Sequence, residues 1–98
     1  MSPRKERVIV RVMCGPGGMT TPHDGRYVVR WNPHTRYGTC SVETTEDRRQ
    51  ARRFTAGQAL DAWRTISHVE PVRPDGLPNR PLSGLTIDMI NISEEQQR

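Results

Sequence analysis

The chain has 98 residues, the length of one domain, and Val, Ile, Leu and Phe together fall below about 20% of it. That apolar content allows one small core and excludes a second domain with a core of its own. The formal net charge of +4 is too modest to favour a disordered chain, and alternating apolar runs favour a folded one. We therefore expect a single domain over residues 1–98, with flexible tails at 1–6 and 93–98.

The basic residues are almost all arginine, because Lys5 is the only lysine among 15 basic side chains. A coding bias towards arginine explains this without any function. The alternative explanation is that the arginines recognise a partner, because the N–H groups of a guanidinium suit carboxylate and phosphate oxygens. The sequence pI of about 9.8 gives the domain a positive field, which attracts acidic proteins and nucleic acid.

Apolar runs long enough to enter a membrane are absent from the sequence. The first residues are polar and do not resemble a signal segment, and no run approaches the roughly 20 residues that span a bilayer. We therefore expect a cytoplasmic protein without a membrane partner, in which Cys14 and Cys40 are reduced thiols.

Three stretches of alternating apolar residues predict the first strands, at residues 7–14, 26–32 and 37–44. Turn residues separate them, including the pair Asp24-Gly25. Strands joined in this way favour an antiparallel meander. The positions expected to face inward are Val8, Val10, Val12, Cys14, Tyr27, Val29, Trp31, Cys40 and Val42.

Two helical segments follow the third predicted strand. Acidic residues before 48–53 predict a short helical turn there, with Phe54 as its anchor in the core. Thr55 precedes a longer helix over about residues 56–67, which we expect to cover the inward face of the sheet. The apolar residues of this helix are Ala56, Ala59, Leu60, Trp63 and Ile66. We expect Trp63 to be buried against Val10, Val29 and Val42 of the sheet.

The last third of the chain begins with a connection over residues 69–81 that is rich in proline and turn pairs. Connections this long in a small domain are often functional. Residues 85–92 then predict a final strand whose alternation breaks at its last two isoleucines, through a bulge or an edge contact. The predicted fold class is α+β, with an antiparallel sheet of about four strands and one main amphipathic helix packed on one face.

The densest charge lies in residues 48–53. On a helix its arginines would stand one turn apart and crowd like charges, which favours a counter-charge or an anionic ligand. The alternative is a solvated face that is partly neutralised by Glu46 and Asp47. The candidate partner-binding residues of this cluster are Arg48, Arg49, Arg52 and Arg53.

A second basic group is predicted on the outward face of the sheet. Cross-strand ion pairs with Glu43 and Asp88 explain it without a ligand. Nucleic acid is the competing explanation, but sheets that read bases usually add exposed aromatic rings, and Tyr27 and Trp31 are expected to face inward. The candidate residues of this group are Arg7, Arg11, Arg26 and Arg30.

Metal and catalytic motifs are weak. Cys14, His23, His34 and Cys40 lack the closely spaced cysteine pair of structural zinc sites. The glycine-rich run at 15–18 lacks the Lys and Ser or Thr that complete a phosphate-binding loop. No catalytic set of side chains stands out, so we expect no cofactor, no metal and no enzymatic activity.

From Tyr37 onward, about two-thirds of the chain carries a series of short motifs. They are Tyr37-Gly38-Thr39, Thr44-Thr45-Glu46-Asp47, Ala51-Arg52-Arg53-Phe54, Ala59, Ala62-Trp63, Arg73-Pro74-Asp75-Gly76 and Pro78-Asn79-Arg80-Pro81-Leu82. In these motifs the chain resembles small proteins of phages and mobile elements, a group that includes anti-CRISPR inhibitors. The resemblance implies a compact sheet-and-helix fold and assigns no catalytic residue.

These observations lead to one functional expectation and one alternative. The expectation is a non-enzymatic, mobile-element-encoded inhibitor of the anti-CRISPR type, which occupies a surface of a host protein or nucleoprotein complex. The alternative is a small basic nucleic-acid-binding accessory protein. Self-association into a homodimer also stays open as a mode of partnering.

Overall fold

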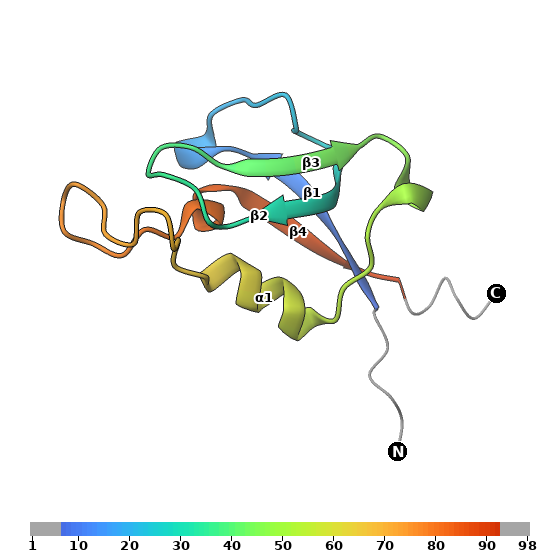
Figure 1. Ribbon diagram of the computed structural model, residues 1–98. Helices are drawn as coiled ribbons and strands as arrows, with labels where there is room; N and C mark the ends of the chain where they lie inside the picture. The colour runs from blue at the N-terminus through green and yellow to red at the C-terminus, as the bar shows by residue number, and fades with distance from the viewer. Residues whose placement is uncertain (1–6, 93–98) are drawn as a thin grey trace, which may run out of the picture.

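Four antiparallel strands form one sheet in the order β3-β2-β1-β4, in a computed structural model that describes residues 7–92 (Figure 1). Within these residues one α-helix, α1 (Ala56–Arg64), packs on one face of the sheet, which confirms the predicted α+β class. The predicted tails at 1–6 and 93–98 lie outside the described residues. The strands are β1 (Val8–Cys14), β2 (Tyr27–Asn32), β3 (Ser41–Thr45) and β4 (Thr86–Asn91).

Phe54, which follows the arginine-rich residues 48–53, completes the sheet. β1 pairs with β4 along its length but with β2 only at one position, where Arg11 faces Tyr27. Phe54 fills the gap, because its N–H donates to the Val8 carbonyl at 2.8 Å and its own carbonyl accepts from the Val8 N–H at 2.9 Å. Buried backbone groups need such partners, so Phe54 is the anchor that the sequence predicted.

A bulge at Val29 decides which residues of β2 enter the core. The register of β2 on β3 shifts between Val28 and Arg30, so the side-chain alternation changes phase there. Val28 is fully buried and Trp31 packs beside it, whereas Tyr27 belongs to the opposite face. The prediction that Tyr27, Val29 and Trp31 all face inward is therefore right only for Trp31.

Both faces of the sheet bury apolar residues. On the second face Ile9 is 2% exposed and Ile92 is 3% exposed, and both pack with Ala51. Ile9 was not among the residues expected to face inward. Ile90 of β4 and Ile92, just beyond that strand, pack in this second cluster rather than marking a bulge. The main core consists of Val8, Val10, Val12, Val28, Phe54, Ala59 and Leu85, with Trp31, Val42, Trp63 and Ile87 packed against it.

The helix begins where predicted and ends earlier. Thr55 and Gln58 form a reciprocal capping box at its start. The chain turns extended at Thr65, whose hydroxyl donates to the Asp61 carbonyl at 2.7 Å, so the predicted end at residue 67 is wrong. Trp63 is only half-buried, with its ring 6.2 Å from that of Trp31, and Val29 is not in the cluster that it joins.

The predicted helical turn over residues 48–53 is a shorter 3₁₀ helix, η2 (Arg48–Gln50). The Asp47 carboxylate caps it by accepting the Arg49 N–H at 2.9 Å. The chain becomes extended at Ala51, which is buried in the second cluster, and the Arg52 N–H then donates to the Val28 carbonyl at 3.0 Å. The arginines therefore do not share the helical face that the sequence predicted.

Candidate functional site

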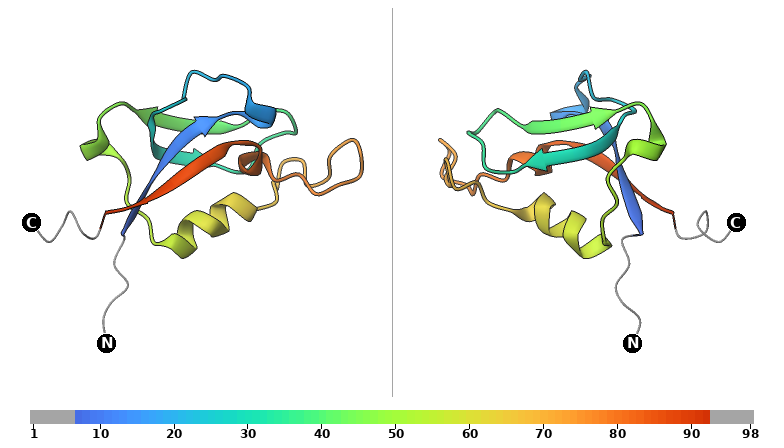
Figure 2. Two further views of the ribbon diagram at one scale, coloured as in Figure 1. Left: turned by 180° about the vertical axis from the view of Figure 1, so that it is seen from behind. Right: turned by 45° about the vertical axis from the view of Figure 1, so that its right-hand side comes forward.

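A long loop projects from the body of the molecule beyond the end of α1, and we call residues 67–79 the 67–79 loop (Figures 1 and 2). Backbone hydrogen bonds close it at two levels. At its base the Ser67 N–H donates to the Asn79 carbonyl at 2.9 Å, and at its tip the Arg73 N–H donates to the Leu77 carbonyl at 2.8 Å. The loop is therefore an internally bonded structure, and it occupies the stretch whose length marked it as a functional candidate.

Two buried polar side chains hold the loop in shape. Asn79 and Ser67 are each 1% exposed. The Asn79 amide donates to the Glu70 carbonyl at 2.8 Å and to the Thr35 carbonyl at 3.1 Å. The Ser67 hydroxyl oxygen accepts the N–H groups of Val69 and Glu70. Because buried polar groups are costly unless paired, these bonds fix one conformation of the loop.

The β2–β3 connection supports the same loop from the side. The imidazole rings of His34 and His68 stack with centroids 4.1 Å apart, and the His68 N–H donates to His34 Nδ1 at 3.1 Å. The Arg73 guanidinium lies 4.8 Å from the centre of the Tyr37 ring, which is cation–π geometry. The predicted strand over 37–44 begins only at Ser41, because its first residues form this support instead.

The 67–79 loop exposes apolar side chains despite being fixed. Val69, Val72 and Leu77 are 57%, 58% and 53% exposed. Single exposed apolar residues are ordinary, but three on one internally bonded loop are available for contact with a partner. None of them was among the residues that the sequence marked as candidates.

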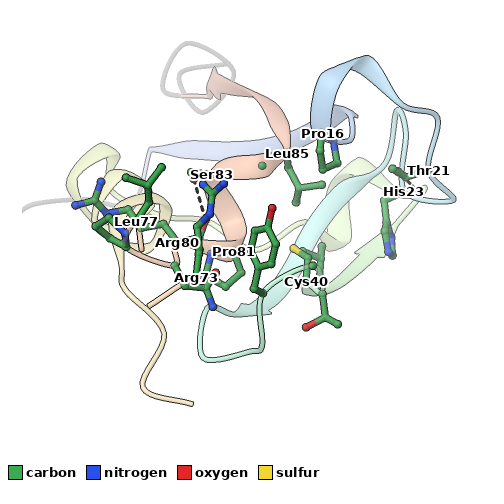
Figure 3. A pocket seen from close by; sticks show the side chains of 17 residues that line it. Pro16, Thr21, His23, Cys40, Arg73, Leu77, Arg80, Pro81, Ser83 and Leu85 are labelled. Carbon is green, nitrogen blue, oxygen red and sulfur yellow. Dashed lines mark hydrogen bonds between the residues drawn. The ribbon is translucent and has the colours of Figure 1, made fainter. Parts of the chain in front are cut away.

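A cavity of about 760 Å³ opens beside the loop (Figure 3). Its walls come from the glycine-rich turn after β1, the β2–β3 connection and the segment that leads into β4. Pro16 closes one wall against Gly84, where a Cβ atom would come within 3.3 Å of the proline ring. The lining residues include no Asp or Glu, and they are Pro16, Thr21, His23, Tyr37, Gly38, Thr39, Cys40, Val42, Arg73, Leu77, Pro78, Asn79, Arg80, Pro81, Ser83, Gly84 and Leu85.

Cys40 lies in the wall of this cavity rather than at the inward strand position that the sequence predicted. The residue is exposed overall, but loss of solvent around the thiol raises its pKa. A higher pKa keeps the thiol protonated near neutral pH and makes it a poor nucleophile.

We expect iodoacetamide to alkylate Cys40 with a pH midpoint above that of a fully hydrated thiol, because burial raises the pKa of Cys40. The measurement is a pH–rate profile of the Cys14→Ser variant, in which Cys40 is the remaining thiol. The same variant unfolded in urea serves as the control, because unfolding hydrates the thiol and returns its pKa to the ordinary value. Identical profiles for the folded and unfolded chains would contradict the burial of this sulfur.

The arginine cluster lies at the end of the sheet remote from the 67–79 loop (Figure 1). It consists of Arg48, Arg49, Arg52 and Arg53. Asp47 neutralises part of it, since Arg49 Nε lies 3.4 Å from its carboxylate. The Arg49 backbone N–H, followed by its side chain, holds the pKa of Asp47 below the ordinary value. The Arg52 guanidinium lies 5.7 Å from the centre of the Phe54 ring. All four arginines are exposed, and their role in binding stays a prediction.

The basic group predicted on the outward sheet face is largely engaged within the protein. Arg30 Nε lies 2.9 Å from the Glu43 carboxylate, and Arg11 Nη2 lies 3.4 Å from that of Asp88. These are the cross-strand ion pairs that the sequence analysis gave as an explanation of the basic group that needs no ligand.

Arg26 lies apart from Arg11 and Arg30. Its Nε donates to the Thr44 hydroxyl at 3.0 Å, and Thr44 pairs with buried Val28, so Arg26 belongs to the core side of the sheet edge. The bulge at Val29 explains why Arg26 and Arg30 face opposite ways. Arg7, the fourth member of the predicted group, is exposed before β1.

The four residues considered for zinc do not converge. His34 stacks on His68, and His23 Nδ1 lies 2.9 Å from the Thr44 hydroxyl. Within residues 7–92, no three His, Cys, Asp or Glu side chains lie close enough together to hold a metal ion.

The longest helix in the same part of the chain is α1, whose nine residues are too few to cross a membrane.

Comparison with known proteins adds no relative. No protein-family model, no curated protein and no solved structure matches the chain.

Proposed function

We propose that the chain is a non-enzymatic, cytoplasmic binding protein that occupies a surface of a host protein or nucleoprotein complex. The observation that supports this most directly is the 67–79 loop, which is held by buried Asn79 yet exposes Val69, Val72 and Leu77. A loop that is already ordered loses little conformational entropy when it binds. Its apolar side chains then gain the full benefit of leaving water.

The arginine cluster supports the proposal from the other end of the molecule. Its exposed guanidinium groups suit carboxylates of a partner, where two parallel hydrogen bonds form. Arg11 and Arg30, like Arg49 of the cluster, are already ion-paired within the protein, so each would have to exchange an internal carboxylate for one of the partner. We expect the partner to meet the loop and the cluster through separate patches.

The proposal is tested by making the loop repel an apolar partner. The double variant Val69→Asp, Val72→Asp places two charges on the exposed projection and leaves its hydrogen-bonded base in place. In affinity capture from the native host, followed by titration of the purified partner, we expect at least about 100-fold weaker binding, since burying a carboxylate against an apolar surface is expensive.

The matched control is Met19→Asp, which adds a charge at another exposed apolar residue outside the loop. It is expected to bind the partner within about twofold of the unmodified chain, as a surface substitution remote from an interface does. Equal capture of the partner by the double variant and the unmodified chain would rule out the loop as the binding surface.

The alternative, nucleic-acid binding, is favoured by one feature. Arg30, Trp31, Arg52, Phe54 and Gln58 line a second hollow of about 300 Å³. A half-buried indole flanked by guanidinium groups offers stacking and phosphate contacts together.

Salt dependence separates the two functions. A nucleic-acid binder is expected to show a steep salt slope on generic DNA or RNA, which neutralising the arginine cluster flattens by about one unit per lost phosphate contact. We expect no such binding at physiological salt. Submicromolar binding to generic nucleic acid that is lost in the variant without the cluster would replace our proposal with its alternative.

An inhibitory role of the anti-CRISPR type is the specific form of this proposal that the resemblance over residues 37–82 suggests. It stays a prediction that rests on the sequence motifs alone. Self-association into a homodimer is a further outcome that the titrations would detect as concentration-dependent mass.

A further inference from the structure

We propose that the cavity beside the 67–79 loop binds a small organic oxyanion, a carboxylate or phosphate carried on an apolar ring or chain. Its volume of about 760 Å³ falls within the range of ordinary ligand sites, roughly 300–1,000 Å³. Three segments that are far apart in the sequence build it, and the bonds of Asn79 fix one of them. Val69 and Val72 of the proposed protein-binding surface do not line the cavity, whereas Leu77 belongs to both.

The charge of the lining favours an anion. Arg73 and Arg80 lie on one side of the cavity, and His23 and Thr21 lie on the other (Figure 3). No carboxylate belongs to the lining, so nothing within it opposes a negative ligand. A concave site with one sign of charge and low-dielectric walls concentrates ions of the opposite sign.

Arg80 is the lining arginine whose guanidinium is free to hold the oxyanion. Within residues 7–92 its guanidinium makes no ion pair and no hydrogen bond, whereas Arg73 is already bound to Asp75 at 2.6 Å. Arg73 still has one unmet group, because its Nε is buried without a hydrogen-bond partner. A ligand oxygen that reached this nitrogen would satisfy it, which favours a ligand with more than one acceptor.

The threonine and serine hydroxyl groups of the cavity do not compete for this role. The Thr39 hydroxyl donates to the Arg36 carbonyl at 2.8 Å, and the Ser83 hydroxyl donates to the Arg80 carbonyl at 2.8 Å. The Thr21 hydroxyl donates to Asp24 at 2.7 Å. Each of these three hydroxyls has one proton, so they can accept but not donate further. The Tyr37 hydroxyl also lines the cavity and makes no hydrogen bond within residues 7–92, so it can donate to the anion beside the guanidinium groups.

The remaining walls suit an apolar body. Leu85 is 7% exposed and belongs to the main core, and half-buried Val42 packs against the same core. Pro16 and Pro81 add rigid hydrocarbon, and the Tyr37 ring adds an aromatic face. Burying a ring against such walls contributes roughly 25 cal/mol for each Å² removed from water.

The test compares three probes with one shape and different charges: 2-naphthoate, 2-naphthyl phosphate and 2-naphthamide. Each is titrated into the full chain and followed by amide chemical shifts. We expect at least one of the two anions to bind about tenfold more tightly than the neutral amide, since one charge-assisted hydrogen bond corresponds to at least that factor. The two anionic probes distinguish carboxylate from phosphate. The shifts are expected at Gly38, Thr39 and Gly84 in the cavity wall.

Arg80→Gln is expected to remove the preference for the anion, about tenfold, while binding of 2-naphthamide changes less than about twofold. The matched control is Arg64→Gln, which removes an exposed arginine at the end of α1 that does not line the cavity. It should leave both affinities unchanged. Both substitutions alter net charge equally, so a difference between them reports the site and not the overall field.

A second readout does not depend on the arginines. In the Cys14→Ser variant, the bound anion is expected to slow alkylation of Cys40 at least about fivefold at saturation, because Cys40 lines the same cavity. The proposal is overturned if the amide binds as tightly as both anions, if Arg80→Gln and Arg64→Gln behave alike, or if Cys40 reacts at the same rate with ligand. None of these results bears on capture of a protein partner by Val69 and Val72, so the two proposals fail separately.

Discussion

Replacing Phe54 with alanine is expected to lower the free energy of unfolding by about 3–5 kcal/mol, the cost of emptying a well-packed aromatic site. The residue is 6% exposed, and its ring centre lies 5.3 Å from that of Trp31. It also sits where the backbone closes the gap between β1 and β2. Small domains are stable by only about 5–15 kcal/mol, so this loss would populate unfolded chains. Urea unfolding followed by circular dichroism measures it.

Phe54→Leu is the matched control, because it keeps an apolar side chain and the same backbone hydrogen bonds. We expect it to cost less than about 2 kcal/mol, since most of the volume is retained. A Phe54→Ala protein with the unfolding midpoint of the unmodified chain would mean that Trp31 and Trp63 form the core without this ring.

The bounds of a strand could be predicted where apolar residues repeat every second position. β1, and β4 as far as Met89, follow this pattern, and both strands lie within one residue of their expected bounds. The faces of β2 could not be predicted. The run from Tyr27 to Trp31 is apolar at most positions, so neither phase is excluded, and the bulge at Val29 switches between them.

The arginine cluster shows how a local pattern fails. Charge and capping at Asp47 favoured a helical turn, and η2 does begin there. Its end is set by tertiary contacts, since Ala51 is buried against Ile9 and the Arg52 N–H bonds to Val28. Such distant partners leave no mark in the spacing of residues 48–53, so the helical arrangement of their charges could not be rejected from the sequence.

The candidate sites were the least predictable feature. The length of the 67–79 loop marked it as functional, but its shape depends on Asn79 reaching Thr35, a residue 44 positions earlier. The cavity depends in turn on that contact, because it brings the segment with Arg80 beside the β2–β3 connection. Arg80 lay in one of the motifs of the resemblance, but it stood apart from the other basic residues, so the denser arginines received the functional interpretation.

Replacing Asn79 with aspartate is expected to release the 67–79 loop from the domain. The substitution removes the amide that donates to the carbonyls of Glu70 and Thr35, at 2.8 and 3.1 Å, and puts a carboxylate beside those oxygens. The site is 1% exposed, so the new charge is unpaired and buried, which typically costs about 3–5 kcal/mol. The loss should fall mainly on the loop, because few core residues belong to it. Hydrogen exchange of the amides of residues 67–79, measured beside those of β1, detects this.

The effect should depend on pH in a defined direction. Burial raises the pKa of a carboxyl group, and the protonated group can donate one hydrogen bond again. The penalty of Asn79→Asp is therefore largest above the folded-state pKa and shrinks as the pH falls through it. Asn32→Asp is the matched control, because Asn32 is exposed and uses its side-chain oxygen to accept the His34 N–H at 3.0 Å, a bond that a carboxylate keeps. If both variants accelerate exchange in the loop equally and at all pH values, added charge rather than loss of the buried amide is responsible, and Asn79 does not hold the loop.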